Sequence, residues 1–189
     1  MALDDAVYKI AFTQEQIAAR VQELGAEIAQ DYAELEPVLV GILKGTFIFM
    51  ADLVRATPIP LLVDFMAISR YGPTAKTKGV VRIVKDLDVS ITGRHVLFVE
   101  DIIDTGMTLH YILRTLSARR PTSLKVCTLF DVPRRRLVEL PIVYRGFTLE
   151  GGFAVGYGLD FREHYRNLPY LGLLDERYLS ASRAGGNQN

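Results

Sequence analysis

The chain has 189 residues, with 22 Lys or Arg and 22 Asp or Glu, so its formal net charge is zero. A balanced charge argues against the extended basic surface that nucleic acids or anionic membranes attract. The single cysteine, Cys127, excludes an intrachain disulfide. The length suits one domain with a sizeable core, and we expect residues 1–189 to form a single domain.

The first residues lack the basic start and apolar stretch of a signal peptide. No apolar run approaches the roughly 18 residues that a membrane helix needs. These features predict a cytoplasmic protein that interacts with neither membrane nor nucleic acid. Cys127 lies in the apolar run Leu124–Phe130, where we expect a buried and unreactive thiol.

The first predicted element is an amphipathic helix from about Thr13 to Tyr32. Thr13 and Gln16 have the spacing of a capping box, in which each side chain accepts a hydrogen bond from the other residue's backbone N–H. Apolar residues then recur at helical spacing, at Ile17, Val21, Leu24 and Ile28. The pattern indicates a helix that faces the core and has no catalytic role.

A series of short apolar runs follows, and these runs are typical of buried strands. They are Val38–Leu43, Leu61–Ile68, Val80–Val84, Val96–Val99, Leu124–Phe130, Ile142–Tyr144 and Phe153–Val155. Helical patterns follow the first and fourth runs, at Phe47–Arg55 and Thr108–Arg119. Strands that alternate with helices predict an α/β fold with a mainly parallel, twisted sheet flanked by helices. The continuous apolar character of the first and fourth runs indicates strands covered on both faces.

Two segments lack a periodic pattern. Residues Ser69–Lys78 are polar and contain Gly and Pro, which predicts a loop long enough to be mobile. The tail Ser180–Asn189 is small and polar, and we expect it to fray.

The most informative stretch is an apolar strand that ends in two carboxylates, Glu100 and Asp101, and is followed by a tight turn and a helix. Ligands of open α/β sheets bind at the carboxyl ends of the strands. Free N–H groups and the dipole at the start of a helix suit a phosphate. The turn therefore predicts a phosphate cradle, made of Asp104, Thr105, Gly106, Met107 and Thr108.

The carboxylates would repel a bare phosphate, so the ligand should also carry hydroxyl groups and a cation. Glu100 and Asp101 suit the hydroxyls of a ribose, directly or through Mg²⁺ and its waters. Asp104 lies within the cradle and is a candidate proton acceptor. Helix capping would explain Asp104 alone, but it does not explain the whole run of acids, threonines and glycine.

This stretch resembles the phosphoribosyl pyrophosphate motif of the type I phosphoribosyltransferases, and other segments resemble the hypoxanthine-guanine phosphoribosyltransferases in particular. Those segments are the pyrophosphate loop with its strand and helix at Gly41–Leu53, the lid entry at Asp64–Gly72, the strand leaving the lid at Val84–Asp88, and the purine-binding hood at Phe153–Asp160 and Tyr165–Leu168. The matches run in order from about Thr13 to Leu173. The resemblance implies the family's core fold with a small hood, built from the N-terminal segment and about residues 145–180, and a mobile lid at about residues 69–80.

The resemblance also implies a role for each matching residue. Pyrophosphate would be held by Lys44, Gly45 and Arg166, with a cis peptide before Lys44. The 5-phosphate would bind residues 104–108, and the ribose hydroxyls would bind Glu100 and Asp101. The purine would contact Ile102, Val132, Phe153, Ala154 and Asp160, with Phe153 stacked on the base. Mg²⁺ would be held by Glu100, Asp101 and Asp160. The lid would include Ser69, Arg70 and Tyr71.

The implied reaction transfers the 5-phosphoribosyl group from 5-phosphoribosyl pyrophosphate (PRPP) to N9 of hypoxanthine or guanine. Mg²⁺, Lys44 and Arg166 would neutralise the charge on the leaving pyrophosphate. Asp104 would take a proton from the base, and a closing lid would exclude water. The implied partners are these small molecules and further copies of the chain, in a homodimer or homotetramer.

One position departs from the family's pattern. A lysine just before a proline usually donates to O6 of the purine, but Val132 precedes Pro133 here. A valine cannot donate a hydrogen bond, so discrimination between 6-oxo and 6-amino purines is an open question. Two substitutes are an arginine of Arg134–Arg136 that reaches back, or the Ala154 backbone with a water. For the arginines we prefer a solvated basic corner.

Two alternative functions therefore stay open. One is an enzyme of the same fold that prefers xanthine or adenine. The other is a non-catalytic, nucleotide-sensing regulator, favoured by the missing lysine and by the basic residues Arg119, Arg120 and Arg134–Arg136. A sensor has no use for a proton acceptor together with a pyrophosphate clamp, and zero net charge disfavours a nucleic-acid surface. Purine transfer is therefore the preferred hypothesis.

Overall fold

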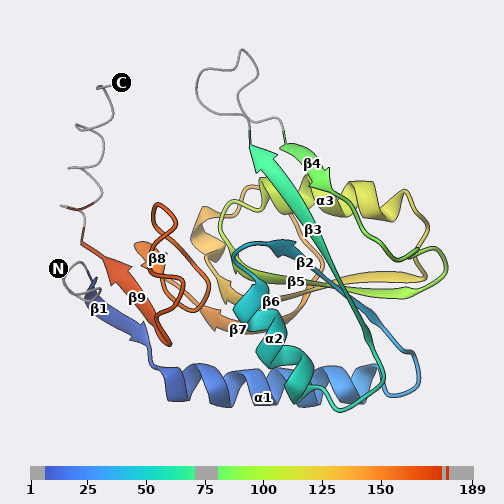
Figure 1. Ribbon diagram of the computed structural model, residues 1–189, viewed down its shortest axis with the longest axis horizontal. Coiled ribbons are helices and arrows are strands. Elements are labelled where there is room, and N and C mark those ends of the chain that lie inside the picture. Colours follow the sequence, from blue (N-terminus) through green and yellow to red (C-terminus); the bar gives the residue numbers. More distant parts are fainter. Residues whose placement is uncertain (1–6, 71–80, 176–177, 179–189) are drawn as a thin grey trace.

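The computed structural model describes residues 7–70, 81–175 and 178, and these residues form two sheets (Figure 1). The main sheet has the order β4-β3-β2-β5-β6-β7, and all its neighbouring strands are parallel except β3 and β4. Its strands are β2 (Val38–Leu43), β3 (Leu62–Arg70), β4 (Val81–Lys85), β5 (His95–Ile103), β6 (Ser123–Asp131) and β7 (Ile142–Thr148). The mainly parallel α/β fold predicted from the sequence is confirmed.

The second sheet is small and antiparallel, with the order β1-β9-β8. Its strands are β1 (Val7–Phe12), β8 (Phe153–Val155) and β9 (Leu171–Leu174). The helices are α1 (Gln14–Asp31), α2 (Phe47–Ala56), α3 (Met107–Ser117) and the 3₁₀-helix η2 (Pro133–Arg135). None of the helices in the described part of the chain combines the length and apolar character that a membrane span requires.

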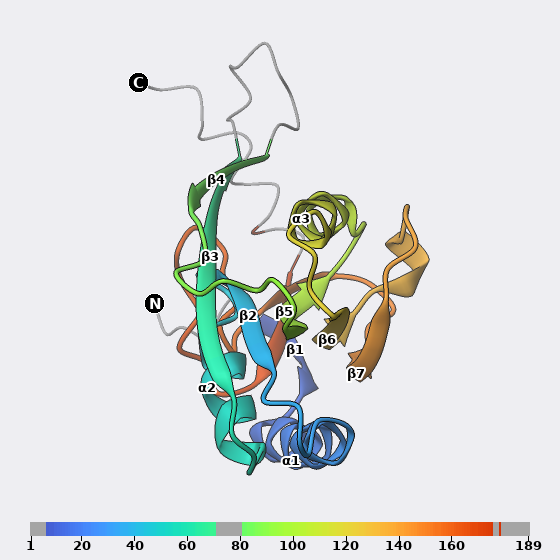
Figure 2. The ribbon, with the colours of Figure 1, turned by 90° about the vertical axis from the view of Figure 1, so that its right-hand side faces the viewer.

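The central strands β2 and β5 of the main sheet are buried on both faces, as their apolar runs predict. Helices α1 and α2 pack on one face in a cluster that includes Leu39 and Leu97, whereas α3 packs on the other face with Val38 and Val40. Figure 2 shows β2 and β5 between α3 and the pair α1 and α2. Successive side chains of a strand point to opposite faces, so both neighbours of Leu39 join the second cluster.

Helix α1 has the predicted capping box. Thr13 Oγ1 accepts from the Gln16 N–H at 3.3 Å, and Gln16 Oε1 accepts from the Thr13 N–H at 2.9 Å. The side chains predicted to face the core are buried, at Ile17, Val21, Leu24 and Ile28. Cys127 is buried in the same cluster, and desolvation raises the pKa of its thiol, as expected for an unreactive cysteine.

The predicted start of the lid loop is wrong. Ser69 and Arg70 belong to β3, where they pair with Arg82 and Val81 of β4. The partner strand comes later in the chain, so polar local composition did not reveal that β3 continues this far. Tyr71 and the rest of the predicted lid lie outside the described residues, as does the tail 180–189.

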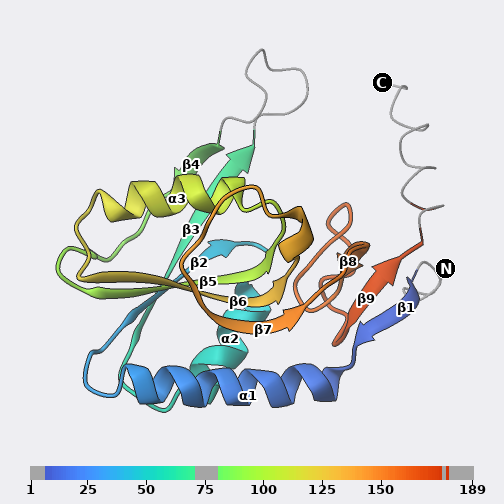
Figure 3. The same ribbon diagram turned by 180° about the vertical axis from the view of Figure 1, so that it is seen from behind.

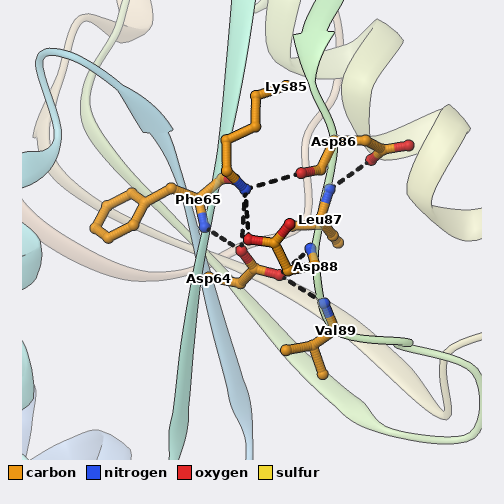
Figure 4. Close-up of polar contacts among 7 residues, drawn as sticks. All are labelled: Asp64, Phe65, Lys85, Asp86, Leu87, Asp88 and Val89. Atoms are coloured by element: carbon orange, nitrogen blue, oxygen red, sulfur yellow. Dashed lines mark hydrogen bonds and ion pairs between the residues drawn. The ribbon is translucent and has the colours of Figure 1, made fainter.

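Asp64 ties β3 to the segment after β4 (Figure 4). Its side chain is 6% exposed, and Oδ2 accepts from the N–H groups of Asp88 at 2.7 Å and Val89 at 2.9 Å. Oδ1 accepts from the Phe65 N–H at 2.7 Å and lies 3.5 Å from Lys85 Nζ. Burial by itself would raise the pKa of Asp64, but these hydrogen bonds and Lys85 outweigh burial and hold the pKa below its usual value.

We expect Asp64→Asn to lower the free energy of unfolding by about 2 kcal/mol near neutral pH, because the amide has no charge and only one acceptor oxygen. The folded-state pKa of Asp64 lies below the unfolded value of 3.8, so the stabilisation is complete above that value and is lost as pH falls through the folded pKa. Urea unfolding should show the two proteins converging in stability in acid. A difference that does not depend on pH would contradict this account.

Candidate active site

Several of the predicted site residues lie at one edge of the main sheet, near the ends of β2, β5 and β6. These strands are parallel neighbours, so their carboxyl ends lie together. Lys44 and Gly45 follow β2, residues 100–102 end β5, and Val132 follows β6. The loop after β8 reaches the same edge through Gly158, where a Cβ would meet the Gly45 carbonyl at 2.2 Å. Distant parts of the chain thus meet where ligands of such sheets bind.

The loop after β2 has no space for a larger residue at Gly45. A Cβ at this position would lie 1.8 Å from Asp101 Oδ2. The Leu43–Lys44 peptide is cis, as the resemblance implies. The loop is therefore packed between the end of β5 and the loop after β8.

Lys44 and Arg166 converge on one carboxylate, Glu163. Lys44 Nζ lies 2.8 Å from Glu163 Oε2, and Arg166 Nη2 lies 3.4 Å from the same oxygen. The hydrogen bond from Lys44, with the charge of Arg166, lowers the pKa of Glu163. Arg166 also lies 2.7 Å from Asp160 Oδ1. The predicted pyrophosphate ligands thus already face a common anion.

Glu163 was not among the residues predicted from the sequence. It lies three residues from both Asp160 and Arg166 in a segment without periodic pattern. Only the fold brings this segment next to Lys44, which is more than a hundred residues away in the chain.

The turn after β5 has the form predicted for a phosphate cradle. Helix α3 begins at Met107, and Gly106 is its N-cap with a φ of 80°, a conformation that favours glycine. Asp104 Oδ2 lies 3.2 Å from Arg135 Nη1. Asp104 Oδ1 is buried and accepts no hydrogen bond from the part of the chain that the structure describes. A buried acceptor of this kind is suited to a donor on a ligand.

The two carboxylates at the end of β5 differ in their surroundings. Glu100 is half-buried and Asp101 is buried. Desolvation raises the pKa of Asp101 to about 6, against the opposing effects of the Ile102 N–H and of the charge on Arg166. Asp160 acts in the same direction as desolvation, so Asp101, Asp160 and Arg166 share one electrostatic environment.

Magnesium would fit this site only with few protein ligands. Across residues 7–70 and 81–175, no three His, Cys, Asp or Glu side chains are close enough to hold a metal ion together. Mg²⁺ usually keeps several waters and binds one or two carboxylates with substrate phosphates. Of the three ligands that the resemblance implies, Asp101 is buried, whereas Glu100 and Asp160 are half-buried carboxylates that suit this sparse coordination.

The residues predicted to bind the purine come from different elements: Phe153 and Ala154 belong to β8, Ile102 to β5, and Val132 follows β6. Phe153 is 40% exposed and makes an edge-to-face contact with Phe161, with 5.4 Å between ring centroids. Ala154 and Ile102 are half-buried. Val132 is 4% exposed and belongs to the main core cluster, so it offers the site no polar group.

The solvated corner preferred for the three arginines is wrong for Arg136. Its side chain is 16% exposed and forms an ion pair with Asp131, which is buried. A buried carboxylate requires a paired cation, and this requirement holds Arg136 inside. Arg135 is exposed but pairs with Asp104, and Arg134 is exposed as predicted.

Comparisons with known proteins agree with this architecture. A family model for the phosphoribosyl transferase domain matches residues 9–162. The hypoxanthine-guanine phosphoribosyltransferase of Mycobacterium avium is 48% identical over 177 residues, covering 90% of this chain and 87% of the relative. A hypoxanthine phosphoribosyltransferase structure from Staphylococcus aureus has a TM-score of 0.88 at 41% identity, covering 93% of this chain and 96% of that one.

A further solved structure, the hypoxanthine phosphoribosyl transferase of Trypanosoma cruzi, has a TM-score of 0.89 at 38% identity and covers 96% of this chain and 98% of its own. The matching domain makes the chain a phosphoribosyltransferase, an enzyme that transfers a pentosyl group. With the fold and the sequence matched over nearly the whole length, the chain belongs to the hypoxanthine-guanine phosphoribosyltransferase family of type I phosphoribosyltransferases.

Proposed function

We propose that the edge residues described above form the active site of this purine salvage phosphoribosyltransferase, which transfers the phosphoribosyl group of PRPP to N9 of hypoxanthine or guanine. The convergence of Lys44 and Arg166 on the Glu163 carboxylate supports this assignment best. Two anion sites at one sheet edge suit a ligand with a phosphate at one end and a pyrophosphate at the other.

The reaction requires both ends of PRPP to be fixed while the bond between C1 of the ribose and the pyrophosphate breaks. Backbone N–H groups of residues 104–108 would bind the 5-phosphate at the start of α3. Pyrophosphate would replace Glu163 as the anion that Lys44 and Arg166 bind, and both cations would stabilise its growing charge. Glu100 and Asp101 would accept hydrogen bonds from the ribose hydroxyls.

The purine would lie between Phe153 and Ile102, with N9 directed at C1 of the ribose. Asp104 would take the proton that the base loses, through the buried oxygen that accepts no hydrogen bond from the described residues. Glu100 and Asp160 would hold Mg²⁺, which would supply further positive charge at the pyrophosphate. Tyr71 and the following residues would form the lid, which begins beyond the end of β3.

We further propose a homodimer or homotetramer. The C-terminal region of the Trypanosoma cruzi relative has a role in its oligomeric state and its activity.

The proposed function is tested by offering the purified protein PRPP and Mg²⁺ with hypoxanthine, guanine, xanthine or adenine, and following nucleotide formation. We expect turnover of hypoxanthine or guanine and none of adenine. Turnover of xanthine or adenine alone would retain the site but change the base. Absence of turnover with all four bases would favour the nucleotide-sensing alternative.

Val132→Lys is expected to raise kcat/KM for hypoxanthine and guanine about tenfold and to leave adenine unaffected, because a lysine donates a charge-assisted hydrogen bond to O6. Wild-type Val132 is buried among apolar residues and makes no such bond. Steady-state kinetics with each base measures the effect. Val132→Leu is the control, since leucine enlarges the side chain without adding a donor. An equal gain with adenine, or a loss with every base, would contradict this account of base selection.

A further inference from the structure

The segment that follows β6, residues 132–137, forms hydrogen bonds with the backbone of the turn after β5. The Val132 N–H donates to the Ile103 carbonyl at 3.0 Å, and the Leu137 N–H donates to the Thr105 carbonyl at 3.0 Å. The chain between β6 and β7, orange in Figure 3, passes beside the start of α3, where Gly106 faces Arg136, Val138 and Leu140. Of the three carbonyl groups that precede Gly106, those of residues 103–105, the first and the third therefore accept hydrogen bonds from the backbone of residues 132–137.

The remaining carbonyl group, that of Asp104, accepts a hydrogen bond from Arg136. Its Nε donates to the Asp104 carbonyl at 3.1 Å, and its Nη2 donates to the Ile103 carbonyl at 3.3 Å. The guanidinium is itself fixed by the ion pair with buried Asp131. Asp131 pairs in addition with Arg145, whose Nε lies 2.7 Å from Asp131 Oδ2. Because a buried carboxylate that loses its partner is costly, Asp131 keeps Arg136 in this position.

These contacts determine where the N–H groups of the turn point. In a trans peptide the C=O and N–H groups point in opposite directions. The carbonyls of residues 103–105 face the segment 132–137, so the N–H groups of residues 104–106 face away from it. Gly106 is packed against the same support, since a Cβ there would meet Arg136 Cδ at 3.0 Å. Successive N–H groups that point the same way at a helix start form an anion-binding concavity.

We propose that Arg136, held by Asp131, is a positioning residue for the 5-phosphate site. It acts through the backbone, because its hydrogen bonds to the carbonyls orient the N–H groups of residues 104–106 toward the ligand. A lysine retains the charge but lacks the planar fork that reaches two carbonyls and a carboxylate together. The inference rests on the proposed function in one respect, since it takes this turn as the 5-phosphate site.

The test compares Arg136→Met and Arg136→Lys with wild type in direct binding of ribose 5-phosphate and of pyrophosphate by calorimetry. Arg134→Met is the matched control, because Arg134 is the exposed neighbour in the same segment. We expect the dissociation constant for ribose 5-phosphate to rise about thirtyfold in Arg136→Met and less in Arg136→Lys, since displaced donors bind poorly. Pyrophosphate binding, which uses Lys44 and Arg166, should stay within about twofold. Arg134→Met should change neither constant.

Equal weakening of both ligands would show that Arg136 only maintains the fold, and an unchanged constant for ribose 5-phosphate would show that the turn needs no support. Either result overturns the proposal. Thermal unfolding of each variant identifies proteins that fail to fold, in which case Arg136→Lys carries the comparison. If ribose 5-phosphate binding depends on Arg136 as expected but the wild-type protein transfers no purine, the proposed function is refuted and this inference still holds. A wild-type protein that does not bind ribose 5-phosphate would overturn the inference.

Discussion

Asp104→Asn is expected to lower kcat by about two to four orders of magnitude, the contribution typical of a positioned proton acceptor. Asparagine preserves the size and shape of the side chain, so the turn at residues 104–108 should keep its conformation. The amide, however, cannot take a proton from the base. The KM for PRPP should change little, because in the proposed site the 5-phosphate binds backbone N–H groups. Removing a negative charge from the cradle should leave phosphate binding unchanged or tighter.

Arg135→Met separates this chemical role from the loss of an ion pair. Arg135 is the partner of Asp104 Oδ2 at 3.2 Å, so its replacement removes the pair and retains the carboxylate. Because the pair is exposed, we expect kcat to fall by less than about threefold. Steady-state kinetics with hypoxanthine and PRPP measures both variants. If Asp104→Asn lowered kcat no further than Arg135→Met does, Asp104 would have no catalytic role.

Gly45→Ala is expected to lower kcat/KM for PRPP at least about a hundredfold, because a methyl group here would displace the Asp101 carboxylate from the proposed pyrophosphate loop. The added Cβ would lie 1.8 Å from Asp101 Oδ2, and Asp101 is buried. Gly158 packs against the Gly45 carbonyl on the other side, so the loop cannot retreat in that direction. Either Lys44 moves away from its ligand or Asp101 leaves the ribose hydroxyls.

A double-mutant cycle with Asp101→Ala tests this cause. Asp101→Ala removes the carboxylate that clashes with the new methyl group. We expect Gly45→Ala to destabilise the protein by about 1–3 kcal/mol, as overpacking does, and to cost much less in the Asp101→Ala background. Urea unfolding measures stability, and calorimetry measures pyrophosphate binding. If the two substitutions were additive in stability, the contact between Gly45 and Asp101 would not be the cause.

The elements predicted well are those whose information is local. The capping box and the repeated apolar positions of α1 lie within one helix, and both are present in the structure. Strand β2 has its predicted bounds, because an apolar run buried on both faces needs no alternation to be recognised. The turn between β5 and α3 was also predicted, since residues 104–108 are contiguous; its role as a phosphate cradle stays a prediction.

The features that were missed depend on partners far away in the chain. Strands β1 and β9 pair with each other across most of the sequence, and neither has a strong period of its own. Ser69 and Arg70 extend β3 only because β4 returns beside them. Each hydrogen bond of a sheet needs one group from each of two neighbouring strands. The position of the partner strand therefore sets the residue at which a strand ends.

The sequence by itself determined the α/β class, the turn between β5 and α3, the family, and the absence of a side-chain donor at Val132, because composition, period and contiguous motifs carry that information. Only the tertiary structure decided that Glu163 forms ion pairs with both Lys44 and Arg166. It also decided that Arg136 pairs with Asp131, next to the turn after β5. The physical reason is the same in both cases. A charged side chain that the fold buries requires an oppositely charged partner close to it in space. The spacing of residues along the chain does not show which residue that partner is.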